Sequence, residues 1–516
     1  MKPSEDGFGF AEDLMSQDKS IIIIGGGIAG LSAGCYAQMN GYQSQIFEMH
    51  HLPGGLCTAW ERKGYIFDGC IHYLFGSGDG LPFNDMWQQL GAVQGREFID
   101  HDEYQRVTDG QNTLIVYTDP DQLQAHMTDL SPGDGKLIQA LCDGIRDFMR
   151  FDMSAMYDIP KPMMGPLAWL KLGTKMMPYV PALARWARQS SRQFAQRFKD
   201  PFLKKAVAQM FSWEEAPVMM GMMLLAYQHL GNAGFPVGAS LEFARAVERR
   251  YLALGGQIRY KTQVEKILTA NGRATGVRLY NDEIHNADWI ISAADGRGTI
   301  FDMLEGEYTN RKIRKMYDGS LPTHQMCQVS MGVNRDLSAE PHWLTVLLDE
   351  PILLAGEERH ELGIKHYCFD PSLAPPGKSV IELIVRTNYA YWQRIYGRRT
   401  YDTEQSQVSD IIIEHLQNLH PGIESDIEFV DEATPMSYER YTGNWMGATS
   451  GWLLTGKTMP MMIMGVPRQL PGLSNFYMAG HWVEPGGTVT LAAASGKNTI
   501  QLICGADGTS FVTSLP

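Results

Sequence analysis

The chain has 516 residues, which is enough for two or three domains with an ample core. Hydrophobic residues make up 44% of it and charged residues 20%, a composition typical of globular proteins that excludes a disordered chain. The net charge of −14 argues against nucleic acid as a general partner. Seven cysteines without a CxxC pair fit a reducing compartment and exclude a zinc module or a disulfide framework.

The first residues, 1–19, are expected to form a flexible tail. They are polar and acidic, and they contain neither the basic region nor the apolar core of a signal peptide. The longest apolar run of the chain, Val218 to Tyr227, has half the length needed to cross a bilayer. The expected location is therefore the cytoplasm, with peripheral contact at the inner membrane face left open.

A strand, a glycine turn and a helix follow the tail. The four isoleucines of 21–24 predict a strand that is buried on both faces. Gly25-x-Gly27-x-x-Gly30 comes directly after it, and a helix-forming run extends over 31–39. Gly25 would make the turn, Gly27 would let a pyrophosphate approach the backbone, and Gly30 would let the helix pack closely. Because this helix N-terminus attracts phosphate, the sequence predicts a dinucleotide site; the alternative is an ordinary glycine-rich turn.

A second strand is expected over 43–48, and it ends in a carboxylate. Glu48 lies where an acid reaches the ribose hydroxyls of a bound dinucleotide. Pro53-Gly54-Gly55 then brings bare backbone close to the pyrophosphate. The adjacent His50 and His51 do not predict a metal site, because no acidic or thiolate cluster accompanies them.

The composition changes between residues 131 and 227. This stretch is rich in methionine, and ten Lys or Arg residues but only one acid, Asp200, lie between Lys161 and Lys205. Basic side chains on an apolar, aromatic-bearing surface are typical of a segment that lies on a membrane. We therefore predict peripheral contact with an anionic membrane through 161–205. The alternative is a solvated basic face over a methionine-filled core.

The rest of the chain alternates between sheet and helix signals. A glycine-rich loop is expected over 231–240 and a helix over 241–254. Antiparallel strands over 264–268 and 274–279 should be joined by an Asn271-Gly272 turn, and a buried strand is expected over 287–295. Strands over 328–333, 343–348 and 380–386, with a helix over 404–418, predict an α+β substrate domain. At the end, a strand over 475–480 precedes a second glycine turn and helix, whose N-terminus near 487–489 is a further anion site.

In order and spacing these blocks resemble the flavoprotein family of phytoene desaturases, carotenoid isomerases and retinol saturases, which is related to the flavin amine oxidases. The resemblance covers nearly the whole chain. The motifs that carry it are Gly25-x-Gly27-x-x-Gly30 with Glu48 and Pro53-Gly54-Gly55, Gly64-Tyr65-x-Phe67-Asp68-Gly69, Gly255-Gly256, Gly276-Val277, Ser292-Ala293-Ala294-Asp295, and the block from Ala479 to Gly496.

The resemblance implies an α/β fold with a discontinuous Rossmann-type FAD-binding domain. An α+β substrate domain and a helical subdomain, the candidate for the membrane contact, would complete it. The expected boundaries are 20–80, 228–300 and 470–516 for the FAD-binding domain, 81–130 and 301–469 for the substrate domain, and 131–227 for the helical, Met-rich basic subdomain.

The resemblance also implies a non-covalent FAD. Glu48 would bind the adenosine ribose, the backbone at Val264 the adenine, and the N–H groups of Thr488 and Val489 the N1/O2 edge of the flavin. Many relatives carry a basic residue where this chain has Leu56, so phosphate neutralisation would come from Arg62 or from the helix dipole alone. The full set of expected cofactor residues is Gly25, Gly27, Ile28, Ala29, Gly30, Glu48, Gly54, Gly55, Leu56, Arg62, Val264, Gly480, Gly487, Thr488 and Val489.

The implied function is that of an FAD-dependent oxidoreductase acting on carbon–carbon bonds of a long apolar substrate: a carotenoid or isoprenoid polyene, a retinoid or an unsaturated lipid. Desaturation, saturation and isomerisation remain open. With one complete fingerprint, a dedicated NAD(P)H domain is not expected, and a diffusible electron acceptor or donor is. His72, which by analogy faces the isoalloxazine, is the candidate catalytic acid or base. Further candidates are Tyr73, Tyr441, His481 and Glu484, and no metal is expected.

Two other functions remain as alternatives. A flavin amine oxidase should show an aromatic pair that cages an amine near the flavin, and the sequence shows no clear pair. A non-catalytic prenyl-lipid escort protein on the same fold, as in the GDP-dissociation inhibitors, would have lost flavin binding. The intact glycines and the C-terminal block argue against that alternative.

Overall fold

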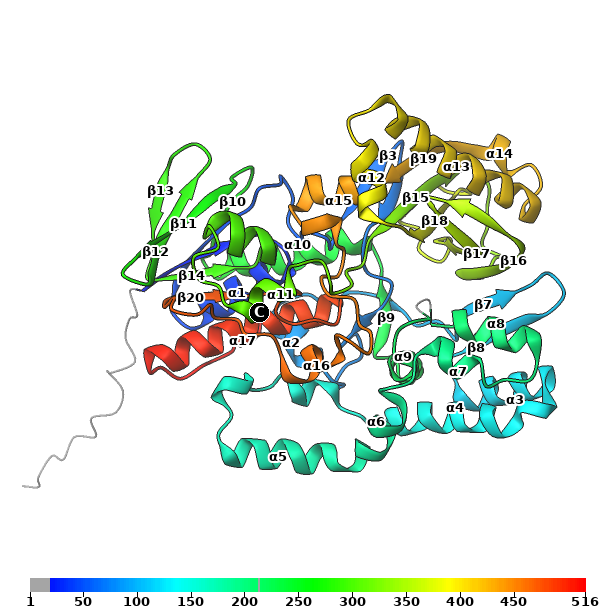
Figure 1. Ribbon diagram of the computed structural model, residues 1–516, viewed down its shortest axis with the longest axis horizontal. Coiled ribbons are helices and arrows are strands. Elements are labelled where there is room, and N and C mark those ends of the chain that lie inside the picture. Colours follow the sequence, from blue (N-terminus) through cyan, green and yellow to red (C-terminus); the bar gives the residue numbers. More distant parts are fainter. Residues whose placement is uncertain (1–18, 212–213) are drawn as a thin grey trace, which may run out of the picture.

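The computed structural model describes residues 19–211 and 214–516 (Figure 1). The expected tail over 1–19 therefore lies, but for its last residue, outside the described residues. Two sheets dominate the described part. A parallel sheet with its helices lies on one side in Figure 1, a larger sheet lies at the upper right, and helices lie below them.

The parallel sheet is assembled from strands that are far apart in the chain. Every neighbouring pair in it is parallel. Its strands are, in spatial order, β10 (Gln257–Arg259), β2 (Gln43–Phe47), β1 (Ser20–Ile24), β14 (Trp289–Ser292) and β20 (Phe476–Met478). This order confirms the predicted discontinuous Rossmann-type architecture, in which the last strand of the chain completes the sheet that the first strand begins.

Helix α1 (Ile28–Met39) packs between two other helices, α10 (Ala239–Ala253) and α17 (Val489–Asp507). Ten of its twelve residues are buried, because the helix carries apolar or small side chains all round. A Cβ atom added at Gly34 would lie 2.7 Å from the Tyr251 ring, and one at Gly496 would lie 2.3 Å from the carbonyl oxygen of Ala29. The glycines therefore set the close spacing of the three helices.

The second sheet is mixed and has seven strands. They are, in spatial order, β19 (Ile427–Ala433), β15 (Met326–Val333), β18 (Ser379–Arg386), β17 (Glu357–His366), β16 (Trp343–Leu354), β7 (Glu103–Thr108) and β8 (Thr113–Tyr117). Helix α13 (Arg399–Leu419) packs on this sheet through Val408, Ile412 and Leu416, which share one helix face. The sequence predicted β15, β16, β18 and α13, whereas β17 had no predicted counterpart.

A three-stranded antiparallel sheet joins β11 (Val264–Ala270), β12 (Arg273–Leu279) and β13 (Ile284–Asn286). Asn271 and Gly272 both have positive φ, at 51° and 71°, which confirms the predicted tight turn between the first two strands.

The expected loop over 231–240 is wrong in its centre. Residues 233–236 form β9 (Ala233–Pro236), which pairs with β5 (Leu74–Phe75) and β6 (Phe98–Ile99). All four residues of β9 are buried. Gly234 lies close to its neighbours, since a Cβ there would be 3.1 Å from the Cβ of Phe98. The glycines and the proline thus mark a tightly packed strand here, not a loop.

The helical region lies below the sheets in Figure 1. It comprises α3 (Pro120–Leu130), α4 (Gly135–Phe148), α5 (Pro166–Met176), α6 (Val180–Trp186), α7 (Ser191–Ala195), α8 (Pro201–Gln209) and α9 (Val218–His229). Helix α9 is buried on nearly every side, so its methionines fill the core, whereas α5 has no buried residue. Within the described residues, no helix combines the length and apolarity needed to span a bilayer.

Shorter elements complete the description. They are β3 (Ala59–Arg62), β4 (Tyr65–Asp68), α2 (Asn84–Gln89), α11 (Arg311–Met316), α12 (Tyr389–Ile395), α14 (Ile423–Asp426), α15 (Pro435–Thr442), and α16 (Met459–Met464).

Candidate active site

A groove of about 310 Å³ runs past the carboxyl ends of β1, β2, β14 and β20. This edge is where open α/β sheets bind their ligands. Most of the expected cofactor residues line the groove: Gly25, Gly27, Ile28, Ala29, Glu48, Gly54, Gly55, Leu56, Val264, Gly480, Gly487, Thr488 and Val489. Segments from both ends of the chain therefore meet around one space, while contact of these residues with a cofactor stays a prediction.

The glycine turn has the backbone conformation expected of a turn that binds a pyrophosphate. Gly25 has a φ of +99°, and a Cβ added at Gly30 would lie 2.0 Å from the carbonyl oxygen of Gly25. Gly30 thus packs directly against the turn, and it does not itself line the groove. Gly27 and Gly54 form an isolated bridge, so two bare backbone segments lie side by side. Gly27 caps α1 without a side-chain hydrogen bond, which leaves the first N–H groups of the helix available to an anion.

Glu48 is held by backbone donors at the end of β2. Its Oε2 accepts a hydrogen bond from the Gly26 N–H at 2.6 Å, and its Oε1 accepts one from the His50 N–H at 2.7 Å. Burial raises the pKa of this carboxyl, while the backbone donors oppose the shift. The carboxylate is therefore fixed at the groove wall, where the Rossmann pattern requires an acid.

Arg62 lies elsewhere, so the expectation that it neutralises the phosphates is not supported. The β3–β4 hairpin directs it toward β19, where its Nε is 3.3 Å from Oδ2 of Asp431. None of the described residues that line the groove is Lys or Arg. Of the two predicted sources of positive charge, the N-terminus of α1 remains.

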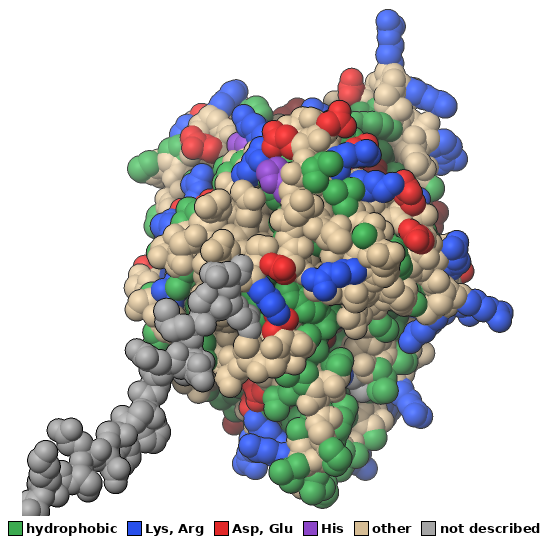
Figure 2. Space-filling view, turned by 90° about the vertical axis from the view of Figure 1, so that its left-hand side faces the viewer, with side chains coloured by type: hydrophobic (Ala, Val, Ile, Leu, Met, Phe, Trp, Pro, Cys, Tyr) green, Lys and Arg blue, Asp and Glu red, His purple; other side chains and the backbone are tan. Residues whose placement is uncertain are grey.

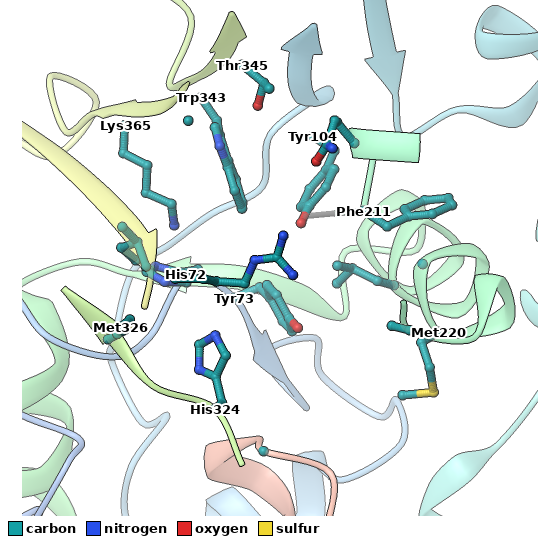
Figure 3. Close-up of a pocket in the computed structure, with 18 of the residues that line it drawn as sticks. His72, Tyr73, Tyr104, Phe211, Met220, His324, Met326, Trp343, Thr345 and Lys365 are labelled. Atoms are coloured by element: carbon teal, nitrogen blue, oxygen red, sulfur yellow. The ribbon is translucent and has the colours of Figure 1, made fainter. Parts of the chain in front are cut away.

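A second cavity, of about 270 Å³, opens beside the seven-stranded sheet (Figure 3). Gly487 and Thr488, at the start of α17, line both this cavity and the groove. The two spaces therefore meet at two of the expected cofactor residues, one of which, Thr488, was expected to face the flavin. Most of the exposed wall of the cavity is apolar, and the aromatic and apolar side chains in it include Tyr73, Phe75, Tyr104, Phe211, Met220, Leu224 and Trp343.

His72 lines this second cavity and not the groove. Its Nδ1 is 3.5 Å from the hydroxyl of Tyr367. Burial, followed by the nearby charge of Lys365, holds the pKa of His72 well below its usual range. The imidazole is therefore neutral at physiological pH, which suits a hydrogen-bonding partner better than an acid.

Lys365 also lines this cavity, and it is an ionisable residue that no sequence motif had pointed to. It is 8% exposed, and its Nζ lies 4.2 Å from the ring centre of Trp343. Figure 3 shows it across the cavity from Phe211 and Met220. Burial lowers the pKa of this lysine to about 7, with the charges of Glu382 and Asp68 opposing the shift.

Two buried carboxyls accompany Lys365. Burial raises the pKa of Glu382 to about 8, and that of Asp68 to about 6. Glu382 accepts a hydrogen bond from Nε2 of Gln328 at 2.7 Å, and Asp68 accepts one from the Ser240 N–H at 3.0 Å. Lys365 lines the cavity, whereas Glu382 and Asp68 are buried behind its wall. Groups with pKa values near neutrality are able to take up and release protons during a reaction.

The other predicted catalytic candidates have separate surroundings. Tyr73 lines the second cavity, and burial raises its pKa to about 12, so it stays protonated. Tyr441 is half-exposed at the groove edge. His481 lines the groove, where burial lowers its pKa to about 4. Glu484 lines neither space: its carboxylate is 2.5 Å from the guanidinium of the buried Arg468, which is a structural ion pair.

Comparisons with known proteins agree with this geometry. Residues 23–90 match the family model for an NAD(P)-binding Rossmann-like domain. Similar proteins include the chloroplastic prolycopene isomerase of Daucus carota, 24% identical over 93% of this chain and 79% of that protein. They also include the lycopene-forming phytoene desaturase of a Paracoccus strain, 22% identical over 94% of this chain and 97% of that protein. These matches confirm the resemblance that the motifs indicate.

Solved structures share the fold. An oxidoreductase from Methanosarcina mazei superposes with a TM-score of 0.60 at 17% identity, over 93% of this chain and 100% of that one. Cyclohexylamine oxidase from Brevibacterium oxydans superposes with a TM-score of 0.59 at 13% identity, over 95% and 100%. The chain therefore shares its fold with both of these proteins over almost its whole length.

Proposed function

We propose that this oxidoreductase, a relative of the carotenoid desaturases and isomerases over most of its length, binds FAD non-covalently and acts on carbon–carbon bonds of a long apolar substrate. One observation carries the proposal: the dinucleotide groove and the apolar cavity meet at Gly487 and Thr488. A cofactor laid along the groove would end where the cavity begins.

The groove suits FAD in its backbone and in its charge. Gly25, Gly27 and Gly54 line the groove with backbone that carries no side chain, and α1 begins there, at Gly27, without a side-chain cap. Thr488 caps α17 by accepting a hydrogen bond from the Leu491 N–H, and Thr488 and Val489, at the start of this helix, line the groove. When bound there, FAD supplies the hydride acceptor or donor for the reaction.

The residues of the chain would bind, orient and shield the substrate. Aromatic and aliphatic side chains of the second cavity exclude water from an apolar chain. Lys365 would hold or move a proton at its Nζ, with Glu382 and Asp68 as the groups that share it, and neutral His72 would orient the substrate or a water molecule. Saturation, desaturation and isomerisation all remain compatible with these roles, and a diffusible electron carrier would serve the first two.

A substrate panel tests the proposal. The protein, purified with its cofactor, should show an oxidised flavin spectrum, and its anaerobic reduction or reoxidation should respond to a carotenoid precursor, a retinoid or an unsaturated fatty acid. The same panel includes putrescine and cyclohexylamine. Flavin reduction by the amines alone would replace the proposal with an amine oxidase. A protein that takes up no FAD on reconstitution would leave only the escort-protein alternative.

We further propose that the protein touches anionic membranes through a narrower segment than 161–205, namely residues 159–180. Apolar side chains of this segment face solvent, including Leu167 at 79% exposure and Leu170 at 64%. Figure 2 shows hydrophobic side chains gathered at the bottom of the molecule, where Figure 1 places α5, with Lys and Arg beside them. By contrast, α7 and α8 bury much of their surface, which leaves 191–205 less suited to the role.

Vesicle binding measures this contact. We expect the wild-type protein to co-sediment with phosphatidylglycerol vesicles at low salt, and the double variant Leu167→Ser/Leu170→Ser to bind about 10- to 100-fold more weakly, because each leucine buries its side chain in the interface. A control variant, Tyr280→Ser/Ile284→Ser, removes two similarly exposed side chains elsewhere and should bind normally. Equal loss in both variants, or no binding of the wild type, would rule out a contact through 159–180.

A further inference from the structure

We propose that the substrate carries an oxygen-bearing end group, a carboxylate or a carbonyl, and that Arg359 binds it inside the second cavity. The inference rests on the proposed function in one respect, namely that this cavity holds the substrate. It narrows the substrate from any long apolar molecule to one with a polar end.

The cavity has a polar row along one of its walls. Alternate residues of a strand face the same side, and four alternate residues of β17 line the cavity: Arg359, Glu361, Gly363 and Lys365. At about 3.3 Å per residue, Arg359 and Lys365 lie about 20 Å apart along the strand. The row therefore has a basic side chain at each end, Arg359 and Lys365, and a glycine, Gly363, between them.

Arg359 is buried with a hydrogen-bond donor to spare. It is 8% exposed, so more than nine-tenths of it is removed from water. Its Nη2 donates to Oε2 of Glu357 at 2.6 Å and to the carbonyl oxygen of Arg386. Its Nε–H has no hydrogen-bond partner among the described residues. A buried guanidinium donor without an acceptor is costly, and an oxygen atom of a ligand would remove that cost.

The charges around Arg359 leave room for an acceptor. Arg386 also lines the cavity, and its nearest acid, Glu214, is 4.0 Å away and is shared with Arg192. Glu361 is the acid of the cavity wall, and burial raises its pKa, which favours its neutral form. Two guanidinium groups thus face a cavity whose own acid is only weakly held in its charged form.

A pure hydrocarbon would gain nothing from these groups. Bringing a hydrocarbon against a buried guanidinium removes water from it and offers no hydrogen bond in return. A chain that ends in a carboxylate or carbonyl satisfies the free donor and places its apolar part along Leu362, Leu383 and Val385, which line the same cavity. Arginine suits this task because its planar group stays charged and presents several donors.

The test compares three ligands of one chain length on the flavin-loaded protein: all-trans-retinoic acid, all-trans-retinal, and the C20 hydrocarbon in which a methyl group replaces the carboxyl group. Quenching of tryptophan fluorescence reports binding, because Trp343 lines the cavity. We expect the acid or the aldehyde to bind about 10- to 100-fold more tightly than the hydrocarbon. A preference for the acid would identify a carboxylate, and equal affinity for acid and aldehyde would identify a carbonyl.

Variants connect the preference to the arginine. Arg359→Gln should lower affinity for the oxygenated ligands to that of the hydrocarbon and leave hydrocarbon affinity unchanged. Arg394→Gln, at an exposed arginine of α12, should keep the full preference. If Arg359→Gln does not fold, Arg359→Lys keeps the charge but lacks the fork of donors, and it should lose most of the preference.

Two results would overturn the inference: equal affinity of the wild type for all three ligands, or a preference that survives in a folded Arg359 variant. Flavin content and the substrate panel are measured on the same preparation. A protein that holds flavin and turns over a hydrocarbon without preferring oxygenated ligands would refute the end-group inference alone. A protein without flavin would refute the proposed function instead.

Discussion

Replacing Lys365 by methionine is expected to lower turnover of the substrate about 100- to 10,000-fold while leaving flavin content unchanged. Methionine fills a similar volume but has no proton to give or take, and positioned acids and bases contribute about this factor. Lys365 lines the second cavity and not the groove, so cofactor binding should be unaffected. Single-turnover kinetics under anaerobic conditions and the flavin absorbance of the purified variant measure the two effects.

Lys378, the residue just before the neighbouring strand β18, offers a matched control. Its Nζ is 2.7 Å from the carboxylate of Glu428 outside the cavity, so Lys378→Met should retain normal turnover. The pH dependence of wild-type turnover should contain an ionisation near pH 7 that Lys365→Met lacks, because burial lowers the pKa of Lys365 to about 7. Normal turnover in Lys365→Met would remove Lys365 from the reaction.

Lys365 should also change the way in which the free energy of unfolding depends on pH. Between pH 7 and its ordinary value of 10.5, the unfolded chain binds a proton at Lys365 that the folded chain does not, so this group makes folding more favourable as the pH rises. Burial raises the pKa of Glu382 to about 8, which has the opposite effect, but only up to that pH. Chemical denaturation at pH 8 and pH 10 should therefore show wild type gaining stability relative to Lys365→Met.

Replacing Gly30 by valine is expected to weaken FAD binding about 100-fold or more. The added Cβ would lie 2.0 Å from the carbonyl oxygen of Gly25, and this backbone atom cannot move away without changing the turn. Overpacking of this kind typically costs 1–3 kcal/mol, and here the displaced atoms are those of the turn that holds the pyrophosphate. Equilibrium dialysis with FAD measures the loss.

Gly135 is the control for this substitution. It begins α4 with an ordinary helical φ of −49°, and an added Cβ would meet nothing within 4 Å. Gly135→Ala should therefore bind FAD as the wild type does. If Gly30→Val folds and still binds FAD with normal affinity, the glycine turn is not the pyrophosphate site.

Local signals predicted the dinucleotide-binding part of the molecule well. The isoleucine strand, the glycine spacing and Glu48 are all contained within about thirty residues, and their physical roles do not depend on distant parts of the chain. The same holds for the Asn271-Gly272 turn. Elements that form only by pairing with remote strands were harder to predict. Strand β9 is short and rich in turn-forming residues, and it is a strand because it pairs with β5 and β6.

The second cavity lay beyond what the sequence reveals. Lys365 and Arg359 belong to no motif, and they line the same cavity as His72 only because β17 lies between β16 and β18. Arg62 is the opposite case, a residue that was predicted to belong to the site but lies away from it. Its position in the sequence is close to the glycine motif, but the β3–β4 hairpin carries it away from the groove to Asp431. Sequence proximity predicted the backbone of the site, and the tertiary fold decided which charges reach it.

The enclosure of α1 by α17 has a consequence for how the protein is made. Helix α1 ends about 450 residues before α17 begins, and α17 is the helix that covers it; β20, which completes the sheet next to β14, also comes late in the sequence. Helix α1 therefore stays without this cover until α17 has been synthesised. Contacts between such distant segments form slowly and leave apolar surface exposed in the meantime, so newly made chains should depend on chaperones and acquire FAD only after α17 has packed on α1.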